Sequence, residues 1–174
     1  MAVLSVRRYG DPALRRRAAP VGEITPEVRS IAGDMIDTMY DEVGLGLAAP
    51  QVGVSLRLIV VADDERREAR ALIDPVIVEQ GGQATAEEGC LSIPGIFASV
   101  TRAEWVRVEA RDVDDGPLSI RAQGLQARVL QHEMDHLDGV LFIDRLDPVT
   151  RDRIKRKIKK EGLSPEPSHH AFAL

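Results

Sequence analysis

The sequence contains a single cysteine, Cys90, so the chain cannot form a disulfide bond within itself. Such scarcity is typical of proteins in the reducing cytoplasm, and it leaves the Cys90 thiol available for metal binding or catalysis. A lone cysteine is also commonly an inert core residue, and its position in the sequence does not decide between these interpretations.

Aromatic residues and long apolar runs are also scarce. Only 3% of the residues are aromatic, so aliphatic side chains must fill the interior. No apolar run approaches the ~20 residues that a membrane helix needs, and residues 1–8 lack the pattern of a secretory signal. The chain has 174 residues, of which 44% are hydrophobic and 29% charged, which is typical of a globular protein. We therefore expect one cytoplasmic domain over residues 1–174, with no membrane partner.

The net charge of −5 is unevenly distributed along the chain. Residues 151–160 contain seven Lys or Arg and one Asp, a local charge of +6, so the rest of the chain carries −11. An acidic body with one basic segment favours a polyanionic partner that docks at that segment. A solvated helix face is the simpler interpretation of the same pattern.

Three segments have helical periodicity. The first begins at an N-cap, Thr25, runs for roughly four turns and ends before Gly44. The second spans residues 123–138 and is apolar on two sides, which indicates a helix buried at the centre of the domain. The third is basic and starts at Asp147. These helices and the strands below predict an α+β fold, with antiparallel strands around the central helix and a helix at the C-terminal end.

Other segments are typical of strands, turns and loose termini. Gly and Asp residues at 114–116 predict an antiparallel hairpin between the two flanking strands, and residues 63–70 are expected to be a charged loop. Residues 1–24 are expected to form an extended arm, and residues 162–174, with His169 and His170, a loose tail. The predicted strands are residues 56–61, 71–78 with an interruption at Pro75, 105–110 and 118–122.

The central helix contains the pattern H-E-x-x-H, formed by His132, Glu133 and His136. Residues four apart lie one turn apart on the same helix face, so both imidazoles can reach one metal ion, with the carboxylate beside it. Two surface histidines on an ordinary helix would give the same pattern by chance. Cys90 could supply a third ligand, and buried histidines are costly unless their nitrogens are satisfied.

A site with three protein ligands leaves one position open, which is typical of catalytic rather than structural metal sites. A divalent metal lowers the pKa of its bound water, and Glu133 could accept the water proton and pass it to the leaving group. The Gln51 side chain and the Leu91 backbone N–H are candidate donors to the oxyanion. Together these groups predict hydrolysis of an amide.

The segment G-L-G-L-A-A-P-Q at residues 44–51 also matches the dinucleotide fingerprint G-x-G-x-x-A. That motif requires a strand before it and a helix after it, whereas here a helix precedes it and Pro50 follows, so we reject nucleotide binding. Gly44 and Gly46 would let a ligand approach the backbone closely, although a plain turn is the simpler interpretation.

Three separated stretches share one resemblance: G-L-G-L-A-A-P-Q at 44–51, E-G-C-L-S at 88–92 and Q-H-E-M-D-H at 131–136. In these motifs and in their order, residues 3–160 resemble peptide deformylase of the compact bacterial type. The resemblance implies removal of the formyl group from the N-formylmethionine of newly made polypeptides, with release of formate. It also implies one divalent metal ion per chain, natively Fe(II), for which zinc, nickel or cobalt can substitute.

The resemblance assigns roles to residues of this chain. One departure is Phe97, where several relatives carry a basic residue that contacts the peptide, so preference beyond methionine stays open. Leu125 and Val129, on the face of His132, are expected to line a pocket for the methionine side chain, although core packing explains Leu125 equally well. The implied metal ligands are Cys90, His132 and His136, and the implied general acid/base is Glu133. The implied oxyanion donors are Gln51 and the Leu91 amide. The substrate backbone is expected to contact Gly44 and Gly46.

The sequence patterns also allow two rival functions, and they predict one macromolecular partner. A zinc endopeptidase also uses H-E-x-x-H but usually takes a third His or Glu after the helix, and a silent metal module could bind RNA through its basic helix. Glu133 and Gln51 argue against the silent module. The basic residues 151–160, anchored through Ile154 and Ile158, are expected to dock on the ribosome, and no DNA partner is expected.

Overall fold

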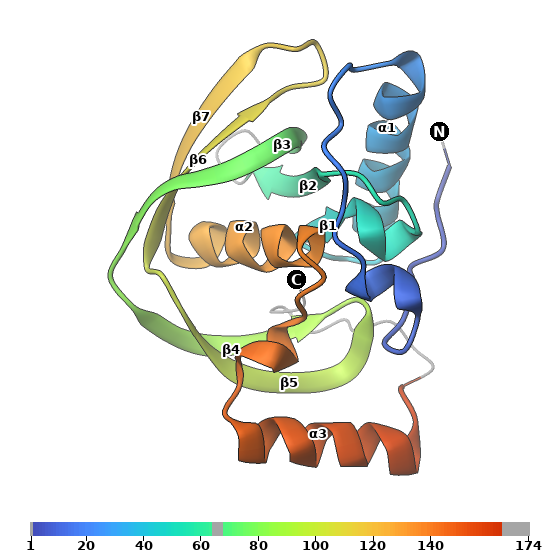
Figure 1. Cartoon of the computed structure of the whole chain (residues 1–174), viewed down its shortest axis with the longest axis vertical. Coiled ribbons are helices and arrows are strands. Elements are labelled where there is room, and N and C mark those ends of the chain that lie inside the picture. The colour runs from blue at the N-terminus through green and yellow to red at the C-terminus, as the bar shows by residue number, and fades with distance from the viewer. Residues whose placement is uncertain (1, 64–67, 165–174) are drawn as a thin grey trace.

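This computed structural model describes residues 2–63 and 68–164. Within these ranges the strands form two antiparallel sheets (Figure 1). The larger sheet has the order β1-β2-β3-β6-β7, and β4 pairs with β5 in the smaller one. The strands are β1 (Gly46–Ala48), β2 (Leu58–Asp63), β3 (Glu68–Gly81), β4 (Ala84–Cys90), β5 (Ile93–Arg102), β6 (Trp105–Arg111) and β7 (Pro117–Gln123).

The α-helices of the described ranges lie at different depths around these sheets. In Figure 1, α2 (Gly124–Leu137) lies inside the curve formed by β3, β6 and β7, while α1 (Pro26–Asp41) packs beside β1 and β2. The helix α3 (Pro148–Glu161) lies on the outside, beyond β4 and β5. The described residues also form the short 3-10 helices η1 (Pro12–Arg15), η2 (Ala49–Val52) and η3 (Phe142–Arg145). The predicted α+β class, antiparallel strands and C-terminal helix are confirmed.

The start of α1 follows the predicted capping chemistry. Thr25 is the N-cap and its side chain accepts a hydrogen bond from Val28 N at 3.3 Å, and Pro26 occupies the first turn. The apolar face buries Val28, Met35 and Met39 against β1 and β2. The helix ends at Asp41, so both predicted ends are confirmed.

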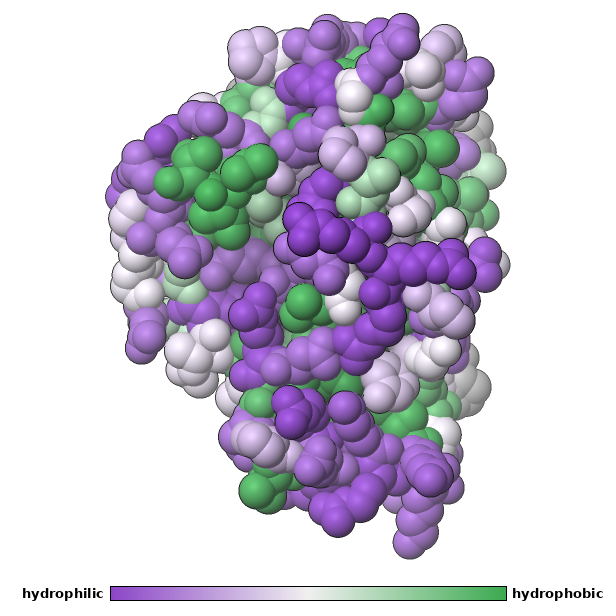
Figure 2. Space-filling model, viewed as in Figure 1, coloured by the Kyte–Doolittle hydropathy of each residue, from purple (hydrophilic) through white to green (hydrophobic). Residues whose placement is uncertain are grey.

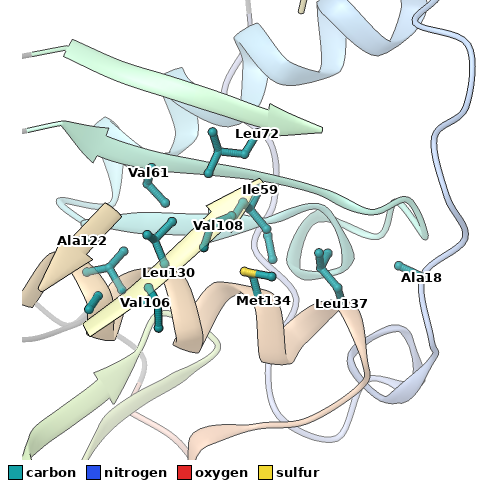
Figure 3. Close-up of a cluster of buried hydrophobic side chains, with 13 residues drawn as sticks. Ala18, Ile59, Val61, Leu72, Val106, Val108, Ala122, Leu130, Met134 and Leu137 are labelled. Carbon is teal, nitrogen blue, oxygen red and sulfur yellow. The ribbon is translucent and has the colours of Figure 1, made fainter. Parts of the chain in front are cut away.

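The side of α2 that faces the large sheet forms the main core (Figure 3). Leu130 and Leu137 are at most 1% exposed and pack with Val106 and Val108 of β6. Burial of one such side chain contributes about 1.5–3 kcal/mol, so this packing holds α2 in place and sets the direction of its other faces.

The strand β3 differs from its predicted form. It runs unbroken past Pro75, because a bulge shifts the register between Ile73 and Val76, and Asp74 there has a φ of +50°. The Asp74 carboxylate accepts hydrogen bonds from Val21 N and Gly22 N, which support this turn of the backbone. The expected charged loop over residues 63–70 was wrong at its edges, because Asp63 pairs with Glu68 at the ends of β2 and β3.

The sequence patterns did not predict β1, β4 or β5. The strand β4 has the sequence ATAEEGC, which has little apolar alternation, and β1 is only three residues long. The predicted hairpin of β6 and β7 is confirmed, with Trp105 opposite Gln123 and Arg111 opposite Pro117.

The two ends of the chain are partly ordered against the body. The expected extended arm contains η1, which buries Leu14 to 1% exposure beside Phe142. In the expected loose tail, Leu163 packs against the same cluster, and Arg8 Nη1 donates to the Ser164 carbonyl at 2.9 Å. His169 and His170 lie outside the described residues. Among the helices of the described ranges, none combines the length and apolarity needed to cross a membrane.

Candidate metal centre and active site

The fold brings Cys90, His132 and His136 together in the interior. Cys90 is the last residue of β4, and the two histidines lie one turn apart on α2. Their ligand atoms all lie within 4.8 Å of one another, and Cys90 Sγ lies 3.5 Å from His136 Nε2. Metal–ligand bonds of about 2.0–2.3 Å bring ligand atoms of one ion to comparable separations. The three side chains are at most 1% exposed, so together they could hold a metal ion.

Several polar atoms at this site have no hydrogen-bond partner among the described residues. These atoms are His132 Nε2, His136 Nδ1 and both carboxylate oxygens of Glu133. A buried polar atom without a hydrogen bond is costly, so a native structure retains several at one point only where something else satisfies them. One thiol and two imidazoles are donors that a divalent transition metal accepts, so the residues fit such an ion.

Burial also sets the protonation of the site when no cation is bound. Burial and the nearby Glu133 raise the pKa of Cys90 to about 12, while burial raises the pKa of Glu133 well above its usual value. Burial, reinforced by the neighbouring His132, holds the pKa of His136 well below its usual range. The His136 imidazole is therefore neutral and its lone pair is available, whereas the thiolate requires the charge of a cation.

A second buried carboxylate, Glu88, orients one of the candidate ligands. Its Oε1 accepts a hydrogen bond from His132 Nδ1 at 2.9 Å, so Nε2 is the ring nitrogen that is left without a hydrogen bond. The pKa of Glu88 falls to about 2, because hydrogen bonds from His132 and Arg102 outweigh the burial that would raise it. Glu88 is 0% exposed. A carboxylate that supports a metal-binding histidine in this way fixes its tautomer and ring orientation.

Arginines surround Glu88 and complete a buried ionic network. Arg102 donates to both Glu88 oxygens at 2.6 and 2.9 Å, and Arg128 donates to Oε2 at 2.6 Å. Arg102 also donates to Asp135, which in turn accepts two hydrogen bonds from Arg145. No local sequence pattern indicated a role for these residues. The only signal was a carboxylate two positions before Cys90, because the arginines come from distant parts of the chain.

The two candidate oxyanion donors lie beside Cys90. Gln51 is 0% exposed, and its Oε1 accepts a hydrogen bond from Ala48 N at 2.9 Å. Its amide nitrogen therefore points the other way, to Ser92 Oγ at 3.1 Å and Cys90 Sγ at 3.7 Å. Leu91 follows Cys90 directly in the turn between β4 and β5 and is 5% exposed. Both predicted donors are therefore close to the candidate metal ligands.

The glycine segment packs closely against the same helix. A Cβ on Gly46 would lie 2.7 Å from Glu133 Cγ and 3.0 Å from Val129 Cγ1, so only glycine fits without displacement. A Cβ on Gly44 would lie 2.8 Å from a methyl carbon of Leu91. The two predicted pocket residues differ, because Val129 is 5% exposed whereas Leu125 is 43% exposed at the start of α2.

A buried cluster of one thiol and two imidazoles, with an adjacent carboxylate and amide donors, is the arrangement of a metal-dependent hydrolase. Residues 3–152 match the family described as polypeptide deformylase. The chain therefore belongs to the polypeptide deformylase family. It is 48% identical to the peptide deformylase of Alkalilimnicola ehrlichii, over 92% of this chain and 91% of that protein. The peptide deformylase of Neisseria gonorrhoeae is 46% identical, over 92% of this chain and 96% of its own length.

Solved structures of the family have the same fold. The peptide deformylase of Legionella pneumophila superposes with a TM-score of 0.85 at 44% identity, over 91% of this chain and 95% of its own. The peptide deformylase of Ehrlichia chaffeensis in complex with actinonin gives a TM-score of 0.85 at 36% identity, over 92% and 99%. The resemblance expected from the three sequence motifs is thus confirmed.

Proposed function

We propose that the chain removes the N-formyl group from the formylmethionine of newly made polypeptides and releases formate. The observation that carries this proposal is the buried set of Cys90, His132 and His136 in a member of the polypeptide deformylase family, beside a Glu133 carboxylate that has no hydrogen bond within the described residues. A zinc endopeptidase is not favoured, because the family match and a cysteine in the candidate ligand set both argue against it.

The proposed ligands are Cys90 Sγ and one ring nitrogen each of His132 and His136. When bound, a divalent ion supplies a Lewis acid that activates water and polarises the formyl carbonyl. We propose Fe(II) as the native ion, as the family resemblance implies, with zinc, nickel or cobalt able to substitute. Imidazole and thiolate donors suit these metals. Glu88 supports the site by holding the His132 ring in one tautomer.

The proposed reaction is hydrolysis of the formyl amide. The water oxygen adds to the formyl carbon while Glu133 takes a proton from that water, and the C–N bond then breaks. Glu133 returns the proton to the departing nitrogen, so that formate and a free methionine amine are produced. Burial without a hydrogen-bond partner supports this role, because it raises the proton affinity of Glu133 toward that of a general base at neutral pH.

The proposed donors to the oxyanion are the Gln51 side-chain amide and the Leu91 backbone N–H. Support comes from the hydrogen bond between Gln51 Oε1 and Ala48 N, which turns the amide nitrogen toward Cys90. The substrate backbone would lie along Gly44 and Gly46. We propose Val129 as a wall of the methionine pocket and the exposed Leu125 as its rim.

Formate release from a formyl-Met-Ala-Ser peptide tests this function. The metal-loaded protein should release one formate per peptide and leave the acetylated analogue intact. Cys90→Ser, loaded in the same way, should retain less metal and release formate more slowly. Cleavage at an internal peptide bond without formate would contradict the proposal and support the endopeptidase.

We further propose that α3 docks this activity on the ribosome in the cytoplasm, where the substrate is made. Ile154 is 8% exposed and holds the helix to the body, while Lys155, Lys157 and Lys160 are exposed. Contacts of such lysines with phosphates are salt-dependent and carry little sequence information. A variant with Glu at these three lysines should co-sediment less with ribosomes at low salt. It should retain full turnover of a short free peptide. Equal co-sedimentation would exclude docking through α3.

A further inference from the structure

A cavity of about 1000 Å³ lies on a different face of α2 from the candidate metal ligands. Its floor is formed by Gln131, Met134, Asp135 and Asp138. These residues are spaced i, i+3, i+4 and i+7, so they form one helix face. None of the candidate metal ligands lines it. The cavity is therefore separate from the proposed deformylation site.

One wall of this cavity carries arginines that are not fully used within the protein. Arg17 is exposed and has no hydrogen bond or ion pair with any described residue. The side-chain hydrogen bonds of Arg57 leave from Nη1, to the carbonyls of Ala18 and Leu137 and to the Asp138 carboxylate. Its other guanidinium nitrogens are therefore available to a ligand.

The remaining charges of the lining are largely paired. Arg102 and Arg145 bind Asp135, and Asp74 binds Arg111, which lies outside the lining. The lining contains four arginines and three aspartates, a net charge of +1 in a chain whose net charge is −5. The unpaired charge is that of Arg17, so the cavity favours an anionic ligand.

The opposite wall is an open strand edge. One edge of β3 pairs with β6 from Ile73 to Gly81. The other edge of β3 pairs with β2, but only along residues 68–73. After Ile73, Asp74 N donates a hydrogen bond to the Arg57 carbonyl. No strand within residues 2–63 and 68–164 pairs with the rest of this second edge of β3. An open edge presents backbone groups that can pair with an additional strand.

Exposed apolar side chains accompany the open edge. Val76 is 56% exposed and Val78 is 39% exposed, and their spacing places both on one face of β3. Figure 2 shows a hydrophobic patch on the side of the molecule where Figure 1 draws β3, β6 and β7, and hydrophilic side chains gathered across the middle of the same face. Cross-strand pairs of apolar side chains stabilise a sheet, so these valines would favour an added strand with apolar residues at alternate positions.

We propose that this cavity binds an extended acidic peptide segment, which adds to the open edge of β3 as a further strand. Backbone hydrogen bonds to residues 75–81 would hold the segment in place, and its apolar side chains would cover Val76 and Val78. Its carboxylates would accept hydrogen bonds from Arg17 and Arg57. A single small anion would satisfy the arginines but would leave the strand edge and the valines uncovered.

The test measures binding of fluorescent acetyl-(Glu-Val)3-amide to the metal-loaded full chain by anisotropy. Arg17→Glu should weaken binding by about tenfold or more, because it removes a charge-assisted hydrogen bond. Arg16→Glu is the matched control, because Arg16 is the adjacent exposed arginine, makes the same charge change and does not line the cavity. Formate release by both variants reports that they are folded.

Two further peptides test the strand pairing and the charge. N-methylation of alternate residues removes backbone donors and should abolish binding, and acetyl-(Lys-Val)3-amide should not bind. Equal losses in Arg16→Glu and Arg17→Glu, or no saturable binding, would overturn the proposed site. Binding of the N-methylated peptide as tight as that of the parent would overturn strand addition. Displacement of the peptide by equimolar citrate would show a small-anion site instead.

Discussion

Two groups of buried polar side chains, one on α2 and the other on the neighbouring strands β4 and β5, differ in how well their hydrogen bonds are satisfied. In the first group, His132 Nε2, His136 Nδ1 and the Glu133 oxygens have no hydrogen-bond partner among the described residues. In the second group, Glu88 and Arg102 are at most 6% exposed yet make short hydrogen bonds to each other and to their neighbours. Burial is similar in the two groups, so burial alone does not distinguish a reactive site from a structural one.

The second group stabilises the fold, whereas the first group is positioned by the fold to bind a ligand. A satisfied ionic network recovers much of its desolvation cost, and loss of one member leaves a charge buried without its partner. A buried carboxylate or imidazole without a hydrogen bond lowers the stability of the fold until a ligand binds to it. Substitutions in the first group should therefore change activity, and substitutions in the second group should change stability and the position of His132.

The largest effect is expected for Glu133→Gln. The amide cannot take a proton from water, so turnover of the formyl peptide should fall by about 10²–10⁴-fold. The metal content should stay that of the wild type, because Glu133 is not a proposed ligand. Steady-state formate release and elemental analysis measure the two quantities. A variant within a few-fold of wild-type turnover would show that Glu133 is not the proton carrier.

Acid should destabilise the metal-free protein through the Glu88 network. The pKa of Glu88 is lowered from 4.5 to about 2 in the folded state, so its contribution is present above pH 4.5 and is lost as the pH falls toward 2. The expected loss in the free energy of unfolding is about 3 kcal/mol. Urea unfolding at a series of pH values should show this loss in the wild type and a shallower one in Glu88→Gln. The same slope in both proteins would assign acid sensitivity to other groups.

Glu88→Gln should also weaken metal binding, by about 10–100-fold. The amide no longer carries the charge that orients His132, and Arg102 and Arg128 lose their buried carboxylate. Competition with a chelator measures the metal affinity. Glu87→Gln is the matched control, because Glu87 is the adjacent residue of β4 and its side chain is exposed. An unchanged affinity in Glu88→Gln would mean that the carboxylate serves stability alone.

The smallest effect is expected at the outer end of the network. Arg145 binds Asp135, but the Arg145 side chain is 49% exposed, so water screens the pair. Arg145→Ala should lower the free energy of unfolding by only about 0.2–1 kcal/mol and should leave metal affinity unchanged. Urea unfolding at neutral pH measures the change. A loss as large as that caused by Glu88→Gln would show that the network stabilises the fold as one cooperative unit.

Sequence patterns predicted the elements whose signals are local. The Thr25 cap and the turn at residues 114–116 involve neighbours within a few positions, so their residue types were sufficient. The bulge beside Pro75 was not predicted, because the support for Asp74 comes from Val21, Gly22 and Arg111. The strands β4 and β5 were missed because their pairing, rather than apolar alternation, defines them.

The sequence by itself determined the part of the site that one helix contains. Helix geometry places His132 and His136 one turn apart wherever the segment is helical, with Glu133 beside them. Only the tertiary structure decided that Cys90 lies 3.5 Å from His136 and that Glu88 holds the His132 ring. Both contacts span more than forty residues of sequence. They depend on how β4 packs against α2, and the free energy of that packing is summed over the whole core rather than encoded in any local spacing.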